Sequence, residues 1–451
     1  VLDEARGRLY IVDTTQNRID VYATAQKRFL NPIPVGMQPL SAAISRDGTR
    51  LYVTIYSSSA LEVVDLDSAT VVKRVSLPAS PEGVAVGGDE RVLITTLGSG
   101  ASNAENRLLL YDPNLTGEDA LRAVATTLPA PTTPTTTIPS SRVYMSTRSN
   151  LTASADGRWI IGLNNPSASS RQMFVFEVAS GSMLRSRTLT SISNVLSVSP
   201  DGDRFMAGLS LFDAGTLAIT AQQNTANSMY PFPNNANFST QSNQGGSVFA
   251  PDMSVLYSAF NIAPVTTTST ATNTSQLLLS DPDNLLILLG IQLPENLSGK
   301  MVISSDGATI YALSQSGFVI IPVSTIYDNP IASIESPAVL LAYDQCGVTS
   351  SKRTGEVVVR NIGKGRLTAT AQVYTSSAVT FTFPIAGQQG VNIAVPPTAG
   401  GGFTGGIPIG GGAAGGGAGA GAPGGAFPII LPQDPITGAG GGQIMIPPGA
   451  A

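Results

Sequence analysis

The chain has 451 residues, of which 42% are hydrophobic and 12% are charged, and its formal net charge is −5. It contains no histidine and one cysteine, so Ser-His-Asp and Cys-His catalysis, His-ligated zinc and intrachain disulfides are excluded. The low share of charge excludes a charge-rich disordered chain or a coiled coil, and the apolar residues suffice for a large core.

Basic and apolar runs argue against nucleic acid and membrane as partners. No Lys or Arg occurs at positions 205–299 or after Arg366, so no basic stripe can follow a phosphate backbone. The most apolar run, Leu285–Ile291, is far shorter than the roughly 20 residues that span a bilayer. A composition rich in Ser, Thr and Asn and poor in Lys favours a secreted, periplasmic or cell-surface protein.

A short acidic turn followed by an apolar strand recurs along the chain. Propeller blades repeat every 40 to 50 residues or so, with four strands in each. The seven turns contain Asp3, Asp47, Asp89, Asp156, Asp201, Asp252 and Asp306, at intervals of 44, 42, 67, 45, 51 and 54 residues. The longest interval contains a Pro/Thr-rich stretch at 126–142, which we interpret as a surface loop inserted into a blade.

The second repeat shows the pattern of a blade most clearly. An apolar run at 40–45 leads to the pair Asp47-Gly48, and three more apolar runs follow at 51–56, 60–66 and 71–75. Asp-Gly between apolar runs predicts a hairpin, because Gly adopts the positive φ of tight turns. We therefore predict an all-β fold, a seven-bladed propeller of four-stranded antiparallel blades over residues 1–344. Tyr10, Tyr52 and Tyr311, in the runs after the turns, are predicted to pack between blades.

The stretch from Ser45 to Val86, with "SRDGTRLYV" at its start, resembles the repeats of YVTN-type bacterial β-propellers, which are related to surface-layer and lactonase-like propellers. The resemblance covers residues 1–344. It implies the propeller fold and no single function, since the same blades carry enzymes, binders and structural proteins.

The two ends of the repeat region bear on how the ring closes. The first repeat appears in the sequence without a strand before Asp3, whereas Ser336–Asp344 resembles an inner strand with no blade after it. Either this segment supplies the missing strand and leaves no open sheet edge, or the true first strand precedes Val1.

Residues 345–397 lack the repeat pattern of the propeller, and their apolar runs predict four further strands. The motif VxNxGxGxL at Val359–Leu367 resembles the first half of Hydin-type Ig-like modules of bacterial surface proteins, and strands are predicted around it and at 379–383 and 391–395. A complete sandwich needs about seven strands, so the module is either incomplete or completed from elsewhere.

Residues 398–451 form a Gly/Ala-rich linker and tail. Positions 400–425 contain 15 glycines, which bury almost nothing and favour a flexible linker. Two short apolar runs follow, Phe427–Leu431 and Gln443–Ile446. They either complete the Ig-like sheet or add to the edge of another molecule. Cys346, at the junction of the two regions, is either a small interior residue or a reactive thiol.

One polar residue lies six to nine positions before each acidic turn, where a loop enters an inner strand. Propellers bind ligands at the mouth of the central channel, so these residues are predicted to ring that mouth; alternatively they are polar only because loops are polar. The predicted ligand-binding residues are Gln38, Glu82, Asn150, Asn194, Gln244, Lys300 and, for the closing strand, Glu335.

The two classes of function differ in what they need from this ring. A lactonase-like hydrolase without histidine needs carboxylates as a base or as metal ligands, and the ring offers only Glu82 and Glu335. The acidic pairs lie at predicted turns, where Asp is favoured for backbone bonding: Asp65/Asp67, Asp201/Asp203 and Asp281/Asp283. We therefore predict a binding or structural scaffold with a protein or glycan partner, and no catalytic residue, metal or cofactor.

Overall fold

The computed structural model describes residues 1–97, 108–124, 150–164, 170–190, 192, 195–222, 238–240, 245–260, 262–264, 275–314, 316–334, 358–370, 379–385, 388–395 and 443–446. The chain divides into two compact units. The first comprises Val1–Asn227, Ala236–Leu286 and Ile291–Ile321, and the second comprises the remaining residues up to Ala451. The predicted domain boundaries at 344 and 397 lie outside the described residues.

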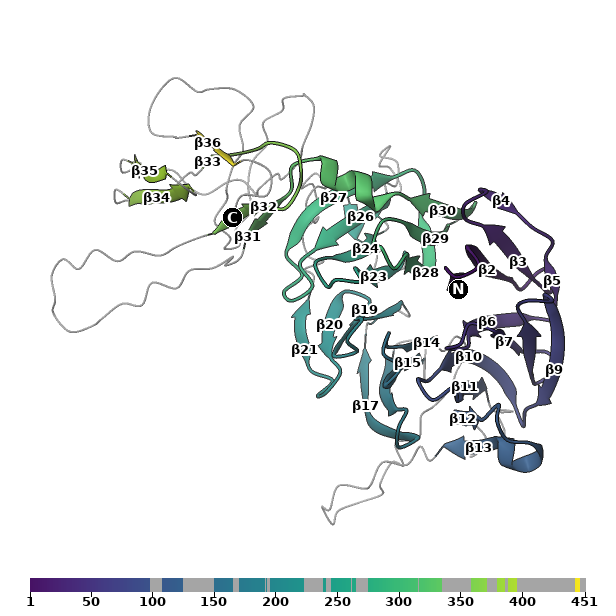
Figure 1. The fold of residues 1–451 in the computed structure, drawn as a ribbon. Helices are drawn as coiled ribbons and strands as arrows, with labels where there is room; N and C mark the ends of the chain where they lie inside the picture. Colours follow the sequence, from purple (N-terminus) through teal and green to yellow (C-terminus); the bar gives the residue numbers. More distant parts are fainter. Residues whose placement is uncertain are drawn as a thin grey trace, which may run out of the picture. The chain divides into compact units, whose positions relative to one another are not determined.

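Antiparallel sheets follow one another around a ring in the first unit (Figure 1). Blade one contains β1 (Leu2–Asp3), β2 (Arg8–Asp13), β3 (Arg18–Ala23), β4 (Arg28–Phe29) and β5 (Ile33–Pro34). Blade two contains β6 (Pro39–Ile44), β7 (Arg50–Ile55), β8 (Ala60–Asp65) and β9 (Thr70–Ser76). Blade three contains β10 (Ser80–Val86), β11 (Val92–Leu97), β12 (Leu108–Tyr111) and β13 (Leu121–Val124).

The remaining blades repeat this order from the inner strand outward. Blade four contains β14 (Asn150–Ala153), β15 (Trp159–Asn164), β16 (Ser170–Glu177) and β17 (Ser182–Thr190). Blade five contains β18 (Leu196–Val198), β19 (Arg204–Ala207), β20 (Ser210–Asp213) and β21 (Ile219–Gln222). Blade six contains β23 (Ser247–Phe249), β24 (Leu256–Phe260), β26 (Ser275–Ser280) and β27 (Ile287–Leu293). Blade seven contributes β28 (Leu297–Ile303), β29 (Ile310–Ser314) and β30 (Gly317–Ile321).

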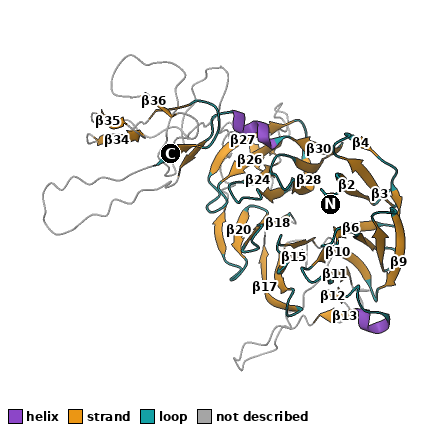
Figure 2. Cartoon of the chain, viewed as in Figure 1, coloured by secondary structure: helices purple, strands orange, loops and turns teal. Residues whose placement is uncertain are grey.

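The predicted all-β, seven-bladed propeller is confirmed. A further strand pair, β22 (Phe238–Thr240) and β25 (Ile262–Pro264), accompanies the blades. Helical structure in the described part of the chain is limited to two 3₁₀ helices, η1 (Gly117–Ala120) and η2 (Val323–Asp328) (Figure 2). None of the described helices has the length and apolar character needed to cross a membrane.

The Asp turns are built by short-range hydrogen bonds, as the sequence predicts. In blade two, the Ser45 hydroxyl donates to Asp47 at 2.6 Å and accepts from the amide of Arg50 at 2.9 Å. Gly48 completes the turn with φ +70°, a conformation that costs glycine little. The bond from Ser45, together with bonds from the backbone and side chain of Thr49, lowers the pKa of the Asp47 carboxyl. The same serine-to-aspartate bond occurs in the turns of three other blades, at Ser154/Asp156, Ser199/Asp201 and Ser304/Asp306.

Hydrophobic cores lie between neighbouring blades. One core combines Tyr10 and Ile19 of blade one with Leu51 and Val53 of blade two, and four further cores join the successive blades from two to six. The ring of Tyr52 meets that of Tyr111 in blade three edge-on, with their centroids 6.3 Å apart. The predicted packing between blades is therefore confirmed for Tyr10 and Tyr52, and for Tyr311 it stays a prediction.

The ring closes by direct packing of blade seven on blade one. The Phe318 ring lies 4.8 Å from that of Tyr22 and 5.7 Å from that of Phe29, and Glu4 accepts a hydrogen bond from the amide of Ser305 at 2.7 Å. The expectation that blade one lacks its inner strand is wrong. Residues Leu2 and Asp3 form β1, and Val1 exchanges backbone hydrogen bonds of 2.8 Å with Tyr10. The segment proposed to close the ring, 336–344, lies outside the described residues.

The described part of the second unit contains three strand pairs. Asn361 organises the predicted glycine turn, because its side chain donates to the carbonyl of Gly365 at 2.8 Å and accepts from the amide of Gly363 at 3.2 Å. The pairs are β31 (Ala332–Ile334) with β32 (Val359–Asn361), β33 (Leu367–Thr370) with β36 (Gln443–Ile446), and β34 (Val379–Ile385) with β35 (Gln388–Val395). The Ig-like assignment stays a prediction, and Cys346, the 400–425 linker and 427–431 lie outside the described residues.

Candidate functional site

The strand order gives the propeller two unlike faces. Strands alternate in direction, so the turns between first and second strands lie on the same side as those between third and fourth strands. We call this side the Asp-turn face; in blade two it comprises 45–49 and 66–69. The opposite side, which we call the entrance face, carries the loops into the inner strands and the turns between second and third strands, such as 35–38 and 56–59.

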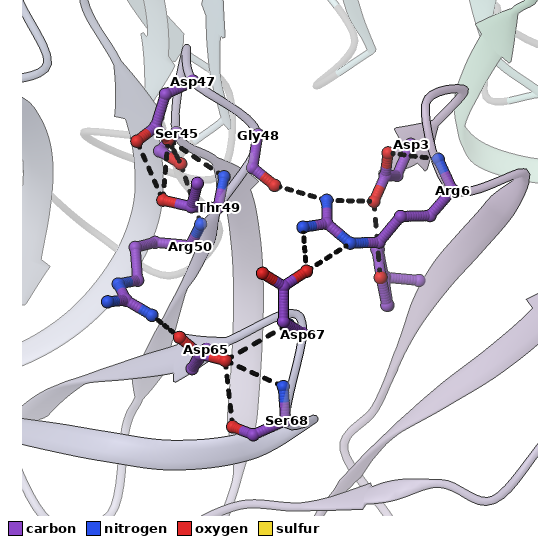
Figure 3. Close-up of polar contacts among 11 residues, drawn as sticks. Asp3, Arg6, Ser45, Asp47, Gly48, Thr49, Arg50, Asp65, Asp67 and Ser68 are labelled. Carbon is purple, nitrogen blue, oxygen red and sulfur yellow. Dashed lines mark hydrogen bonds and ion pairs between the residues drawn. The ribbon is translucent and has the colours of Figure 1, made fainter.

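The Asp-turn face is occupied by contacts that join one blade to the next (Figure 3). The Arg6 guanidinium of blade one donates to Asp67 and to the Gly48 carbonyl of blade two, at 3.1 and 2.6 Å, and pairs with Asp3 at 3.3 Å. The bond to Asp67 is the main cause that raises the pKa of Arg6, and it lowers the pKa of Asp67. Each polar group in this set has a partner within the protein, so the set joins blades rather than offering a ligand site.

Arg46 extends this pattern over three blades. Its guanidinium donates to the carbonyls of Ala155 and Ser154 in blade four, at 2.9 and 3.0 Å, and to that of Val86 in blade three at 3.4 Å. Its backbone amide donates to Glu90 of blade three at 3.1 Å. Desolvation lowers the pKa of Arg46, although an arginine stays charged at neutral pH. This side chain therefore links the turns of blades two, three and four.

On the entrance face, polar side chains hold the loop that leads into blade two. The amide of Gln38 donates to Asn17 at 2.9 Å, and the side-chain oxygen of Gln38 accepts from Ser57 at 2.5 Å. Glu62, a buried carboxylate in β8, accepts from the amide of Gly36 at 3.0 Å. Gln38 itself is exposed, at φ +56°. The loop thus presents one predicted residue, Gln38, from a position fixed by three others.

Three inner strands carry a β-bulge at their entrance-face ends. The register shifts between Pro39 and Ser41 in β6, between Pro81 and Val84 in β10, and between Leu297 and Met301 in β28. Bulges redirect side chains and are frequent next to binding sites. Two predicted residues, Glu82 and Lys300, lie within these bulges.

The bulges of blades two and three are closed by threonine hydroxyls. Thr54 of β7 accepts from the amide of Ser41 at 2.9 Å, and Thr95 of β11 accepts from the amide of Gly83 at 2.8 Å. Glu82 is buried in its bulge, with 4% of its surface exposed, and it has a partner there. Glu82 is thus part of the interior rather than of an open ring.

The bulge of blade seven is larger and more open. Four steps along β28, from Leu297 to Met301, face two steps along β29, from Ser314 to Ala312. Residues 298–300 are all exposed, and a side chain placed at Gly299 would meet no atom within 4 Å. Surrounding protein nevertheless lowers the pKa of the Lys300 ammonium by desolvation. Lys300 is therefore an exposed residue of the bulge, and its place at the channel mouth stays a prediction.

The remaining predicted residues divide between exposed and undescribed positions. Asn150 opens β14 and is exposed, with a partner in the protein. Asn194, Gln244 and Glu335 lie outside the described residues, so their place in the ring stays a prediction.

Sequence reasoning missed the residues that fix the entrance loops. In blade seven, Glu295 accepts from the amide and hydroxyl of Ser316, at 3.1 and 2.7 Å, and the bond from Ser316 is the main cause that lowers the pKa of Glu295. In blade two, Glu62 likewise fixes the entrance loop, by accepting a hydrogen bond from the amide of Gly36. A single carboxylate inside the apolar run of β8 was the available signal, because a buried charge needs a partner.

The acidic pairs hold turns, as predicted. The amides of Asp67, Asp203 and Asp283 donate to the carboxylates two residues earlier, at 3.2, 3.1 and 2.8 Å. In the part of the chain that the structure describes, no group of three or more acidic or cysteine side chains is placed to hold a metal ion.

Comparison with known proteins identifies a fold and no family. No protein-family model matches this sequence, and no curated protein matches it by sequence. Among solved structures, it is similar to the hydrazine synthase of Kuenenia stuttgartiensis, at 15% identity and a TM-score of 0.50, over 71% of this chain and 94% of that chain. The likeness shows the propeller fold.

Two further solved structures are similar at slightly lower TM-scores. The β-propeller domain of Myceliophteria thermophila Cps50 (Swd1) is 12% identical, with a TM-score of 0.49 over 72% of this chain and 96% of that chain. U3-55K is 13% identical, with a TM-score of 0.49 over 71% of this chain and 94% of that chain.

Proposed function

We propose that this chain is a secreted or cell-surface binding and scaffold protein, which takes a protein or glycan partner at the entrance face of its propeller. The observation that carries the proposal is the contrast between the two faces. On the Asp-turn face, the guanidinium groups of Arg6 and Arg46 donate their hydrogen bonds to residues of other blades. On the entrance face, the bulge at 298–300 leaves exposed polar groups at the end of an inner strand.

The entrance loops also have the rigidity that a binding surface needs. Glu62 and Asn17 fix the loop into blade two, and Ser316 fixes Glu295 ahead of blade seven. Pre-positioned loops lose less conformational entropy when a partner binds. The exposed Met37 and Leu40, at 66% and 40%, add apolar contact area beside Gln38.

The finer assignments belong to the same proposal. The motif at 45–86 supports placing the repeats with YVTN-type surface propellers, and the turn at 359–367 supports an Ig-like module in the second unit. Both groups are associated with bacterial cell surfaces, and the low lysine content agrees with such a location.

The test is to screen the full chain against glycan and peptide arrays. We expect a ligand whose binding weakens when Gln38 and Leu40 are both replaced by alanine, and is unchanged when Gln26, an exposed turn residue on the Asp-turn face of blade one, is replaced by alanine. Binding that survives the Gln38/Leu40 variant, or that requires the Asp-turn face, would overturn the proposal. Protease treatment of intact cells carrying the chain tests the location, since a surface protein is cleaved and a periplasmic or internal one is not.

A further inference from the structure

The bulge of blade seven differs from the bulges of blades two and three in the residue that lies opposite it. Its opposing residue on β29 is Leu313, at the position where β7 and β11 have Thr54 and Thr95. Leucine has no hydroxyl to accept from an amide. In the described part of the chain, no side chain accepts a hydrogen bond from the amides of residues 298–300.

The carbonyl of Gly299 in the bulge points towards blade six. A Cβ placed on Gly246 of blade six would lie 2.6 Å from the Gly299 oxygen, so this carbonyl faces blade six closely. A trans peptide is planar, with its carbonyl and amide directed oppositely. The amide of Lys300 therefore points away from blade six.

The ammonium of Lys300 has no counter-ion among the described residues. The carboxylate nearest in sequence, Glu295, is bonded to Ser316 instead. An anion bound beside this exposed ammonium would therefore pair with it without displacing a described carboxylate of the protein.

We propose that the blade-seven bulge, formed by Ser298, Gly299 and Lys300, is an anion site that binds a carboxylate or phosphate group of the ligand through the ammonium and the amide of Lys300. Hydrogen bonds from an ammonium to a carboxylate or phosphate are stronger than those between neutral groups, and Lys commonly binds phosphate. The open space beside Gly299 provides the room. The inference rests on the entrance face being the binding face, and it adds the chemical class that this face selects.

The small number of lysines makes the site directly observable. The chain has five, at positions 27, 73, 300, 352 and 364. Reductive ¹³C-dimethylation keeps their charge and gives each its own NMR signal, and a Lys300→Arg variant assigns the signal of Lys300. Sodium phosphate and sodium citrate serve as the two probes, with sodium chloride at matched ionic strength as the reference.

We expect the Lys300 signal to shift with saturation in phosphate, citrate or both, while the other four follow the chloride reference. By calorimetry, Lys300→Met should weaken binding of that probe at least tenfold, and Lys27→Met, which removes an exposed charge on blade one, should leave it within about twofold. A Lys300 signal that moves only with ionic strength, or equal binding by Lys300→Met and wild type, would overturn the anion site.

The two proposals fail separately. An array ligand that binds at the entrance face, together with a Lys300 signal that does not respond to either probe, overturns the anion site alone. Saturable phosphate or citrate binding at Lys300, with every array ligand bound elsewhere, supports the anion site and overturns the partner proposal. The preference between phosphate and citrate then distinguishes phosphorylated ligands from carboxylated ones.

Discussion

The replacement Arg46→Met tests whether the Asp-turn face is a structural surface. Methionine keeps most of the apolar stem and removes the guanidinium, so the carbonyls of Ser154 and Ala155 lose their shared donor. Hydrogen bonds from a charged donor contribute about 1.5–3 kcal/mol each when shielded from water. The bond to Val86 is long at 3.4 Å and adds little.

Exposure reduces that figure for Arg46, because more than a third of its surface reaches solvent. We expect a net loss of about 2 kcal/mol in the free energy of unfolding. The single tryptophan, Trp159, follows the turn that Arg46 contacts, so its fluorescence reports unfolding of blade four during urea titration. The slope of the transition should stay unchanged while its midpoint falls.

Arg28→Met is the matched control, because Arg28 is exposed and bonds only weakly to Gln26, at 3.3 Å. It should cost less than about 0.5 kcal/mol, as most surface substitutions do. Equal midpoints for the Arg46 and Arg28 variants would refute the reasoning that the Arg46 bridge joins the blades. Arg46→Met should also leave anion binding on the opposite face intact.

Three further predictions concern packing, pH and the entrance loop. Gly162→Ala should cost about 1–3 kcal/mol in urea unfolding, because its methyl would lie 2.0 Å from the Phe174 ring, and adding Phe174→Leu should recover part of that loss. The hydrogen bond from the Ser45 hydroxyl lowers the pKa of the Asp47 carboxyl, so the ionised carboxylate stabilises the fold above about pH 4. This stabilisation is lost as the pH falls through the folded-state pKa of Asp47. Between pH 7 and 3, the melting temperature of Asp47→Asn should therefore fall less than that of the wild type. Glu62→Gln should speed amide exchange at Gly36 about fivefold, equivalent to about 1 kcal/mol, and unchanged exchange there would contradict its positioning role.

The repeat pattern carries most of the fold. The Asp-Gly pairs place the hairpin turns because their geometry depends on residues within five positions of each other, as the bonds of Ser45 show. Tyr52 could be assigned to an interblade core because strand alternation fixes its face. Closure of the ring was predicted less well, because it depends on contacts such as that between Tyr22 and Phe318, which are far apart in the sequence.

The candidate site depends on register, which sequence spacing does not specify. Counting back from the turns reaches Glu82 and Lys300 alike, yet one is buried and the other exposed. The difference comes from the size of each bulge and from the residue opposite, Thr95 in one blade and Leu313 in the other. Such cross-strand partners become known only once the strands are paired.

The most direct test of the account is hydrogen-exchange mapping of the full chain with and without the ligand that the arrays identify. We predict slower exchange at the entrance-face segments 35–40 and 297–301, with no change at the Asp-turn segments 45–49 and 154–158. Protection confined to the Asp turns or to the outer strands, with the two entrance segments unchanged, would contradict the assignment of the entrance face as the binding surface.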